Sequence, residues 1–311
     1  MHRILVTGCS GFLASHLLKL LQQDGDSQLF GMTEVPGFTF PRVEVSQVDI
    51  RRRDDVLRLL AAIRPDITFH LAAVTHVAFA WKNPALTYEV NFIGSSNLLE
   101  AVLSAAPGSR LALMSSAEVY RSDGAVAITE NSPTRIQNPY ALSKLAMEML
   151  GDLYWKTHRL QVCKIRAFNF TGPGQDAKFV ASDFASQIAA IEKGKQEAVI
   201  RVGNLAAVRD FSDVRDVARY VQVIGRHGRG GDVYNLCSGR SYSIREILDV
   251  LLSLAKLPIQ VEVDAAKFRP LDNPQINGDP ARLRTEFKLQ PEISMEKTLL
   301  DLLNYWREFP G

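Results

Sequence analysis

The stretch RILVTGCSGFLASHLL, residues 3–18, contains an apolar segment, a turn with two glycines, and then apolar residues at helical spacing. This order predicts a buried strand, a tight turn and a helix that begins near Phe12. Gly8 permits a turn that a side chain would obstruct, and Gly11 lets the backbone approach a pyrophosphate at the free N–H groups of the helix. A glycine pair alone is a weak signal, but at the first strand–helix junction of an α/β chain it favours a dinucleotide site.

Strand and helix patterns alternate through the first half of the chain. The predicted strands are residues 3–8, 27–33, 43–50, 66–73, 109–116 and 160–169, and the predicted helices include 12–22, 54–63 and 84–105. Such alternation predicts an α/β fold with a Rossmann-type, doubly wound parallel sheet. Because right-handed crossovers bring the carboxyl ends of parallel strands to one edge, ligands are expected at that edge.

The pattern changes after the turn GPGQ at residues 172–175. The helices and short strands that follow predict a smaller C-terminal α/β substrate lobe, interwoven with the first part of the chain. The expected division is a first domain of residues 1–172, with return segments near 210–240, and a lobe of residues 173–311.

The composition is that of an ordinary globular chain of 311 residues, with 46% hydrophobic residues and a formal net charge of +2. So small a charge gives no argument for a nucleic-acid partner, and the acidic residues after the short basic run 51–53 predict a solvated helix start. Every apolar run is shorter than the roughly 18 residues of a membrane span, and no signal peptide precedes the first strand, so we expect a cytoplasmic protein without a membrane partner. No metal site or disulfide framework is expected from the spacing of Cys9, Cys163 and Cys237.

A serine, a tyrosine and a lysine form the candidate catalytic set. Tyr140 has an ordinary pKa of about 10, which makes a poor proton shuttle near neutrality. Lys144 follows one helical turn later on the same face, and its ammonium is expected to lower the pKa of the phenol and to hold the nicotinamide ribose. Ser116 ends the fifth predicted strand, where its hydroxyl can hydrogen-bond a substrate carbonyl or alcohol. Together with the glycine turn, this set favours catalysis over two ordinary residues of a surface helix.

Two acidic positions bear on the choice of dinucleotide. Glu34 ends the second predicted strand, where a carboxylate can accept both adenosine ribose hydroxyls and repel a 2′-phosphate. Asp49 ends the third predicted strand, where it can accept from the adenine amino group. The expected cofactor is NAD(P)H, with a lean to NADH.

The chain resembles the extended short-chain dehydrogenase/reductase family of NAD-dependent epimerases and dehydratases in the motifs TGCSGFLASHL, HLAAVTHV, SSAEVY and YALSK. The resemblance implies a domain that binds NAD(P), a lobe that binds a nucleotide sugar, and Ser116, Tyr140 and Lys144 as catalytic residues. It also implies a homodimer formed through the helix at 84–105 and the helix that carries Tyr140. The expected cofactor-binding residues are Gly8, Ser10, Gly11, Phe12, Leu13, Glu34, Asp49, Ile50, Leu71, Ala72, Ala73, Tyr140 and Lys144.

Within that family, the segments RAFNFTGPGQ, FVASDFASQI and VGNLAAVRDFSDVRD resemble enzymes that act on GDP-mannose derivatives. The resemblance implies a GDP-linked deoxyhexose as substrate. Arg209 and Arg269 are candidates for forked contacts to a diphosphate, and Asp183 can accept from a guanine edge. The expected substrate-binding residues are Ser116, Asn169, Phe179, Val180, Asp183, Arg209 and Arg269.

The residue type at position 118 bears on which reaction the protein catalyses, and here it is Glu118. It matches the glutamate that, in dehydratases of this group, removes a proton during loss of water across C5 and C6, whereas the epimerase-reductases have a cysteine there. Glu34 and the segment TGPGQDAKFV stand where the dehydratases carry arginines, which favours a reductase. The leading expectation is reduction of the C4 keto group of GDP-4-dehydro-6-deoxy-D-mannose to GDP-D-rhamnose. GDP-mannose 4,6-dehydration with Glu118 as base, another nucleotide-sugar epimerase or reductase, and a non-catalytic dinucleotide sensor remain open.

Overall fold

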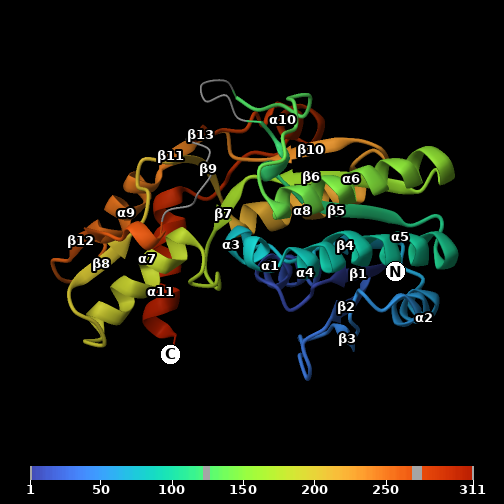
Figure 1. The fold of residues 1–311 in the computed structure, drawn as a ribbon. Coiled ribbons are helices and arrows are strands. Elements are labelled where there is room, and N and C mark those ends of the chain that lie inside the picture. Colours follow the sequence, from blue (N-terminus) through green and yellow to red (C-terminus); the bar gives the residue numbers. More distant parts are fainter. Residues whose placement is uncertain (1, 122–126, 268–274, 310–311) are drawn as a thin grey trace.

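A computed structural model describes residues 2–121, 127–267 and 275–309. Figure 1 shows a large α/β part, built around one sheet, beside a smaller lobe that contains the C-terminal helix. The turn at 172–175 lies between β7 and α7, where the chain first passes from one part to the other. The division into residues 1–172 and 173–311 stays a prediction.

The large part is organised around a seven-stranded sheet in which every neighbouring pair is parallel. The order β3-β2-β1-β4-β5-β6-β10 is that of a doubly wound dinucleotide-binding fold with one strand added at the edge, so the predicted fold class is confirmed. Its strands are β1 (His2–Thr7), β2 (Ser27–Thr33), β3 (Glu44–Gln47), β4 (Ile67–His70), β5 (Arg110–Ser116), β6 (Gln161–Ala167) and β10 (Val233–Leu236).

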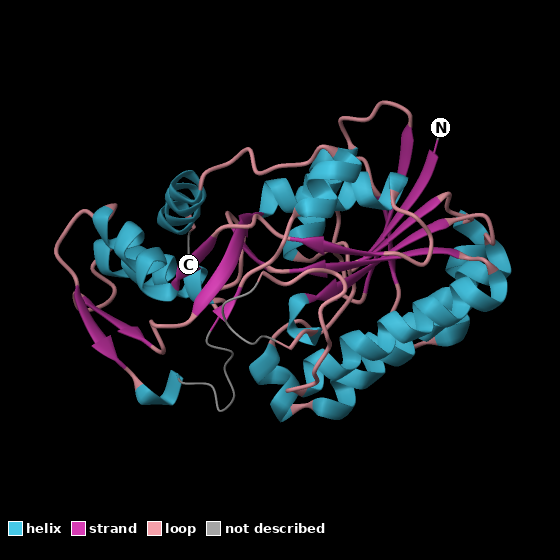
Figure 2. Ribbon diagram, turned by 90° about the horizontal axis from the view of Figure 1, so that it is seen from above, coloured by secondary structure: helices cyan, strands magenta, loops and turns pink. Residues whose placement is uncertain are grey.

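Helices cover both faces of this sheet, as Figure 2 shows. Ile4 and Val6 of β1 point to a core shared with α1 (Phe12–Leu21) and α8 (Val214–His227). Leu5, between them, points to the opposite core, shared with α2 (Arg53–Ile63), α5 (Gly94–Ala105) and α6 (Pro139–His158). This period of two is what a strand buried on both faces requires.

The predicted helix at 84–105 is interrupted. It consists of α4 (Pro84–Tyr88), a π-helical turn (Glu89–Ile93) and α5. Inside the π turn, the Asn91 amide accepts from Val74 N at 2.7 Å and donates to Val74 O at 2.9 Å and to Ser143 Oγ at 2.9 Å. The turn thus ties the loop after β4 to α6. That loop also holds the short helix α3 (Val77–Lys82), which the sequence pattern did not predict.

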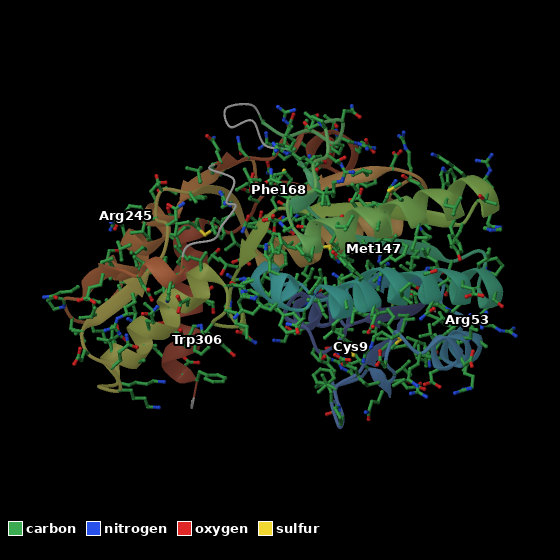
Figure 3. The ribbon with its side chains drawn as sticks, viewed as in Figure 1. Cys9, Arg53, Met147, Phe168, Arg245 and Trp306 are labelled. Atoms are coloured by element: carbon green, nitrogen blue, oxygen red, sulfur yellow. The ribbon has the colours of Figure 1, made fainter. Side chains whose placement is uncertain are left out.

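The smaller lobe has its own apolar core. Helices α7 (Val180–Glu192), α9 (Ile244–Ser253) and α11 (Met295–Glu308) enclose it. Figure 3 labels Met147, in the core of the large part, and Trp306, beside the core of the lobe. The remaining elements are β7 (Asn169–Thr171), β8 (Val199–Val202), β9 (Val208–Asp213), β11 (Ser241–Ser243), β12 (Gln260–Val263), β13 (Gln275–Ile276), α10 (Ala281–Phe287) and 3-10 turns at 117–119 and 265–267.

The second half of the chain also completes the large part. Helix α8 packs against α1, and β10 adds to the sheet beside β6. Within the described ranges, no helix has the length and apolar character to cross a membrane. Cys9, Cys163 and Cys237 are free and buried.

Candidate active site

A cleft of about 680 Å³ lies along the carboxyl edge of the parallel strands and reaches the smaller lobe. It is large enough for a drug-sized ligand. Its lining includes every expected catalytic and cofactor-binding residue, together with Asn169 and Phe179. The residues expected to act in catalysis and cofactor binding therefore lie together along one cleft, at the sheet edge where ligands were expected.

The glycine turn forms one wall of the cleft. Gly8 has φ +67°, and a Cβ atom there would lie 2.7 Å from the backbone N and Cα of Ala72, so only glycine fits without displacement. Gly11 caps the amino end of α1 and supplies no side chain to its N–H groups. A close backbone approach beside an open helix N-terminus suits the pyrophosphate of a dinucleotide.

The acidic positions lie at the far end of the cleft, beside an arginine. Glu34 follows β2 directly and is exposed, whereas Asp49 lies two residues beyond the end of β3. Asp49 accepts from Arg51 Nε at 3.0 Å and from Nη2 at 2.6 Å, and these bonds lower its pKa. The carboxylate expected to receive an adenine amino group is thus paired already. Arg51 is exposed just before α2 (Arg53–Ile63), as expected for a solvated helix start, and it also lines the cleft, which was not expected.

Tyr140 lies in the first turn of α6 and is 7% exposed. Asn138 begins the helix, because its side chain accepts from Ala141 N at 2.7 Å, and Pro139 occupies the first turn. Burial raises the pKa of Tyr140, while a hydrogen bond with Ser116 lowers it and the charge of Glu118 raises it. Burial, the largest of these influences, therefore favours the protonated phenol that a proton donor requires.

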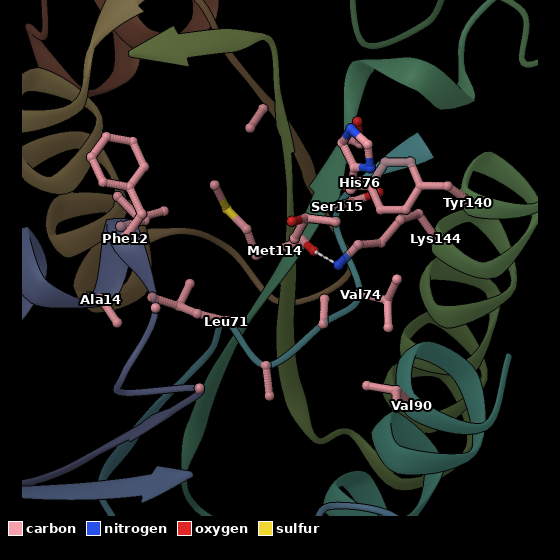
Figure 4. Close-up of a pocket in the computed structure, with 18 of the residues that line it drawn as sticks. Phe12, Ala14, Leu71, Val74, His76, Val90, Met114, Ser115, Tyr140 and Lys144 are labelled. Carbon is pink, nitrogen blue, oxygen red and sulfur yellow. Dashed lines mark hydrogen bonds between the residues drawn. The ribbon is translucent and has the colours of Figure 1, made fainter. Parts of the chain in front are cut away.

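Lys144 points past the tyrosine ring toward the sheet, as Figure 4 shows. Its Nζ donates to Met114 O at 2.6 Å and lies 6.0 Å from the centroid of the Tyr140 ring. Burial lowers the pKa of Lys144 to about 8, and the charge of Glu148 opposes this. The sequence led us to expect the ammonium to lower the pKa of the phenol, but in the structure the bond with Ser116 has that effect.

Glu118 shares this part of the cleft. It lies in the 3-10 turn after β5, and its backbone N donates to Ser116 Oγ at 3.2 Å. Its carboxylate accepts from Asn138 Nδ2 at 3.1 Å, which ties it to the residue that begins α6. One part of the cleft is therefore lined by Ser116 and Glu118, from the end of β5 and the turn after it, and by Tyr140, from the start of α6.

The expected substrate-binding residues do not all reach the cleft. Val180, Asp183 and Arg209 are absent from its lining. Asp183 accepts from Lys267 Nζ at 2.8 Å and from Gln187 Nε2 at 2.9 Å, so its carboxylate is engaged within the lobe. Arg209 is buried and donates to Val208 O at 2.8 Å. Arg269 lies outside the described residues.

The structure adds lining residues that the sequence analysis did not single out. His76 caps α3 by accepting from Phe79 N at 3.3 Å, and its ring meets Phe179 edge-on at 6.0 Å. Gln175 is held by Thr171 Oγ1 at 2.6 Å and by Phe170 O at 2.9 Å. His76 lay within a motif that carried the family resemblance, but nothing in the local pattern indicated that it faces the cleft.

A glycine turn after the first strand, with serine, tyrosine and lysine at the fifth strand and the next helix, defines an enzyme of the extended short-chain dehydrogenase/reductase class. Residues 5–302 match the profile of the family described as GDP-mannose 4,6 dehydratase, and the chain belongs to this family.

Relatives of known activity match along almost the whole chain. GDP-6-deoxy-D-mannose reductase of Pseudomonas aeruginosa is 34% identical over 307 residues, which cover 98% of this chain and 97% of the relative. GDP-6-deoxy-D-talose 4-dehydrogenase of Aggregatibacter actinomycetemcomitans is 30% identical over 90% of both chains. The structure of RMD from Pseudomonas aeruginosa in complex with NADPH has a TM-score of 0.85 at 32% identity, covering 99% of both chains.

Proposed function

We propose that the protein reduces the C4 keto group of GDP-4-dehydro-6-deoxy-D-mannose with a nicotinamide dinucleotide and forms GDP-D-rhamnose, which is GDP-6-deoxy-D-mannose. The observation that carries this proposal is the buried phenol of Tyr140, which lines the same cleft as Ser116, Lys144 and the glycine turn. The likeness to a GDP-6-deoxy-D-mannose reductase supports the choice of sugar.

In this mechanism, the protein residues manage a proton while the bound cofactor supplies a hydride to C4. Ser116 donates a hydrogen bond to the C4 oxygen, and Tyr140 transfers its proton to that oxygen as negative charge develops. Lys144 would hold the nicotinamide ribose and supply positive charge near the phenolate that remains. Gly8, Gly11 and the amino end of α1 would hold the pyrophosphate.

A second candidate function is dehydration of GDP-mannose. The contact that favours it is between Glu118 and Asn138, because it holds a carboxylate in the cleft near Ser116. Glu34 and the segment after Asn169, where dehydratases of this group resemble one another in carrying arginines, favour the reductase instead. A reductase must exchange its cofactor in every cycle. The absence of these arginines is consistent with the looser cofactor binding that such exchange requires.

Product analysis tests the two candidates. The protein is incubated with GDP-mannose alone, and separately with the 4-keto-6-deoxy sugar nucleotide plus NADH or NADPH. The reductase consumes reduced cofactor only with the keto sugar, and its product has the 6-deoxy-D-manno configuration. A 4-keto product from GDP-mannose alone selects the dehydratase. A product of the talo configuration would mean that the hydride reaches C4 from the opposite face to the one proposed. Dinucleotide binding without turnover of either sugar selects the sensor.

Glu34 gives a prediction about cofactor choice. We propose a preference for NADH, because the exposed carboxylate at the end of β2 repels a 2′-phosphate. Replacing Glu34 by glutamine is expected to lower the KM for NADPH relative to NADH roughly fivefold, less at high salt, as for a contact of about 1 kcal/mol in solvent. The control is Glu44→Gln, an exposed glutamate on the neighbouring strand outside the cleft. An unchanged KM ratio would contradict the assignment.

The exposed apolar side chains of α6 support the proposed homodimer. Leu142, Met149 and Leu153 are 44%, 66% and 57% exposed, and their spacing of seven and four residues puts them on one helix face. Ile93 adds a further exposed apolar side chain from the π turn. We propose that this face packs against its symmetry mate. The cytoplasmic location stays a prediction.

A charge on this face is expected to separate the subunits. Met149→Glu should convert a dimer into a monomer at micromolar concentration, because a carboxylate would be buried without a partner in the interface. Sedimentation velocity measures the change. Val263→Glu is the matched control, since Val263 is also 66% exposed but lies on β12 in the smaller lobe. Dimers that persist in Met149→Glu, or monomers in the parent protein, would count against this interface.

A further inference from the structure

A buried ion pair lies directly behind the catalytic residues. Glu148 follows Lys144 by one turn of α6 and is 2% exposed, and Arg166 on the neighbouring strand β6 is 6% exposed. Arg166 donates through Nε to both carboxylate oxygens, at 2.9 and 3.1 Å, and through Nη2 at 2.6 Å. This forked geometry is the strong form of an arginine–carboxylate contact, and the mechanism described above makes no use of it.

The same carboxylate also holds the strand that carries Ser116. Ser115 Oγ donates to Glu148 Oε1 at 2.5 Å, and Ser115 pairs in register with Arg166 across the sheet. The two neighbours of Ser115 are both used in the site: Met114 O accepts from Lys144, and Ser116 bonds with Tyr140. Glu148 thus fixes the middle residue of a three-residue segment whose outer members contact the lysine and the tyrosine.

The charges around Lys144 come from several elements. From β4, His70 is buried between Thr7 Oγ1 and Ser95 Oγ, each at 2.8 Å, and burial lowers the pKa of His70 to about 3, so its ring is neutral. On α6 itself, Tyr140 is a protonated phenol and Glu148 is the carboxylate whose charge raises the pKa of Lys144. Arg166, from β6, is turned to Glu148.

We propose that Glu148 and Arg166 are positioning residues: Arg166 fixes the Glu148 carboxylate, which aligns Ser116 with Tyr140 by holding Ser115 and places a negative charge one helical turn from Lys144. This inference rests on the proposed function only for the turnover measurement. Neither Glu148 nor Arg166 lines the cleft, so the effect requires no contact between these residues and the substrate.

Glu148→Gln tests the charge, because the amide keeps the shape and can still accept from Ser115. Without the negative charge, Lys144 should lose its proton at lower pH. The alkaline limb of kcat/KM is therefore expected to move down by about one pH unit, while activity near pH 6 changes less than severalfold. Dinucleotide binding, followed by nicotinamide fluorescence as a function of pH, should show the same displacement without any sugar present.

Two further variants separate positioning from folding. Glu148→Gln leaves Arg166 buried without its partner and is expected to be destabilising. The double variant Glu148→Gln with Arg166→Met removes both charges, so it should recover thermal stability and still show the displaced limb. Asp152→Asn is the matched control: Asp152 bonds Lys164 between the same helix and strand, one turn further along α6, and its loss should leave both pH profiles unchanged.

The outcomes are distinguishable. An unchanged alkaline limb in both the single and the double variant, in turnover and in binding, overturns the inference. An equal displacement in Asp152→Asn also overturns it, because the effect would then be a general consequence of loosening α6. If the parent protein turns over neither sugar but its dinucleotide binding shows the displacement in Glu148→Gln, the proposed function fails and the positioning role stands.

Discussion

Tyr140→Phe is expected to lower kcat about a thousandfold, the largest effect of any substitution considered. The change removes one oxygen from a side chain that is almost completely buried and hydrogen-bonded to Ser116, and it leaves the ring in place. The C4 oxygen would then have no positioned proton donor. Single-turnover reduction of the keto sugar measures the loss, and equilibrium binding of GDP and of the dinucleotide should stay within severalfold of the parent protein.

Tyr154→Phe provides the control, because Tyr154 lies on the same helix, half-buried and outside the cleft. It should keep normal turnover. If Tyr140→Phe also turned over at a near-normal rate, the phenol would not be the proton donor, and the enzymatic assignment of this cleft would have to begin from another group.

Lys144→Met should give the second largest loss. Methionine fills a similar volume without the charge, so kcat is expected to fall about a hundredfold and the dissociation constant of the dinucleotide to rise about tenfold. The melting temperature should not fall, because a buried ammonium is costly to desolvate and its removal relieves that cost. The expected combination is a well-folded protein that binds and reacts poorly.

The comparison variant is Lys156→Met, an exposed lysine three turns later on α6. It should change neither kcat nor dinucleotide binding. A Lys144→Met protein that binds the dinucleotide normally would separate the lysine from the ribose, whereas one with normal kcat would remove it from the catalytic set.

The glycine turn and the strand-end serine were predictable because both follow from local pattern combined with one topological rule. Gly8 and Gly11 mark a strand–helix junction, and parallel strands bring their carboxyl ends together. Tyr140 and Lys144 were placed on one helix face by spacing alone. These residues meet in the cleft because backbone topology, rather than any specific side-chain contact, brings them there.

The directions in which side chains point within the site were not predictable. Four-residue spacing puts Lys144 beside Tyr140, but it does not tell where the ammonium points, and its partner is a backbone oxygen on β5. The π turn was not predicted for a similar reason. The apolar periodicity of the sequence continues through it, and the contacts of Asn91 with Val74 and Ser143 depend on tertiary packing.

The substrate-binding residues were the least predictable part of the candidate site. Asp183 was chosen for its carboxylate, yet Lys267, 84 residues later in the chain, already occupies that group. Arg51 is exposed, as the run of arginines beside aspartates indicated, but the pattern did not show that it also lines the cleft. The ion-pair partner of Asp183 is too distant along the sequence to be found by counting residues.

The return of the chain to the large part has a consequence for biosynthesis. The core beside α1 includes Val217 and Tyr220 of α8, Leu236 of β10, and Leu289, which follows α10. A nascent chain released from the ribosomal tunnel only as far as residue 172 would therefore expose the part of this sheet face that α1 does not cover. We therefore expect the dinucleotide-binding layer to complete its core late in synthesis, and the apolar surface exposed until then to favour aggregation.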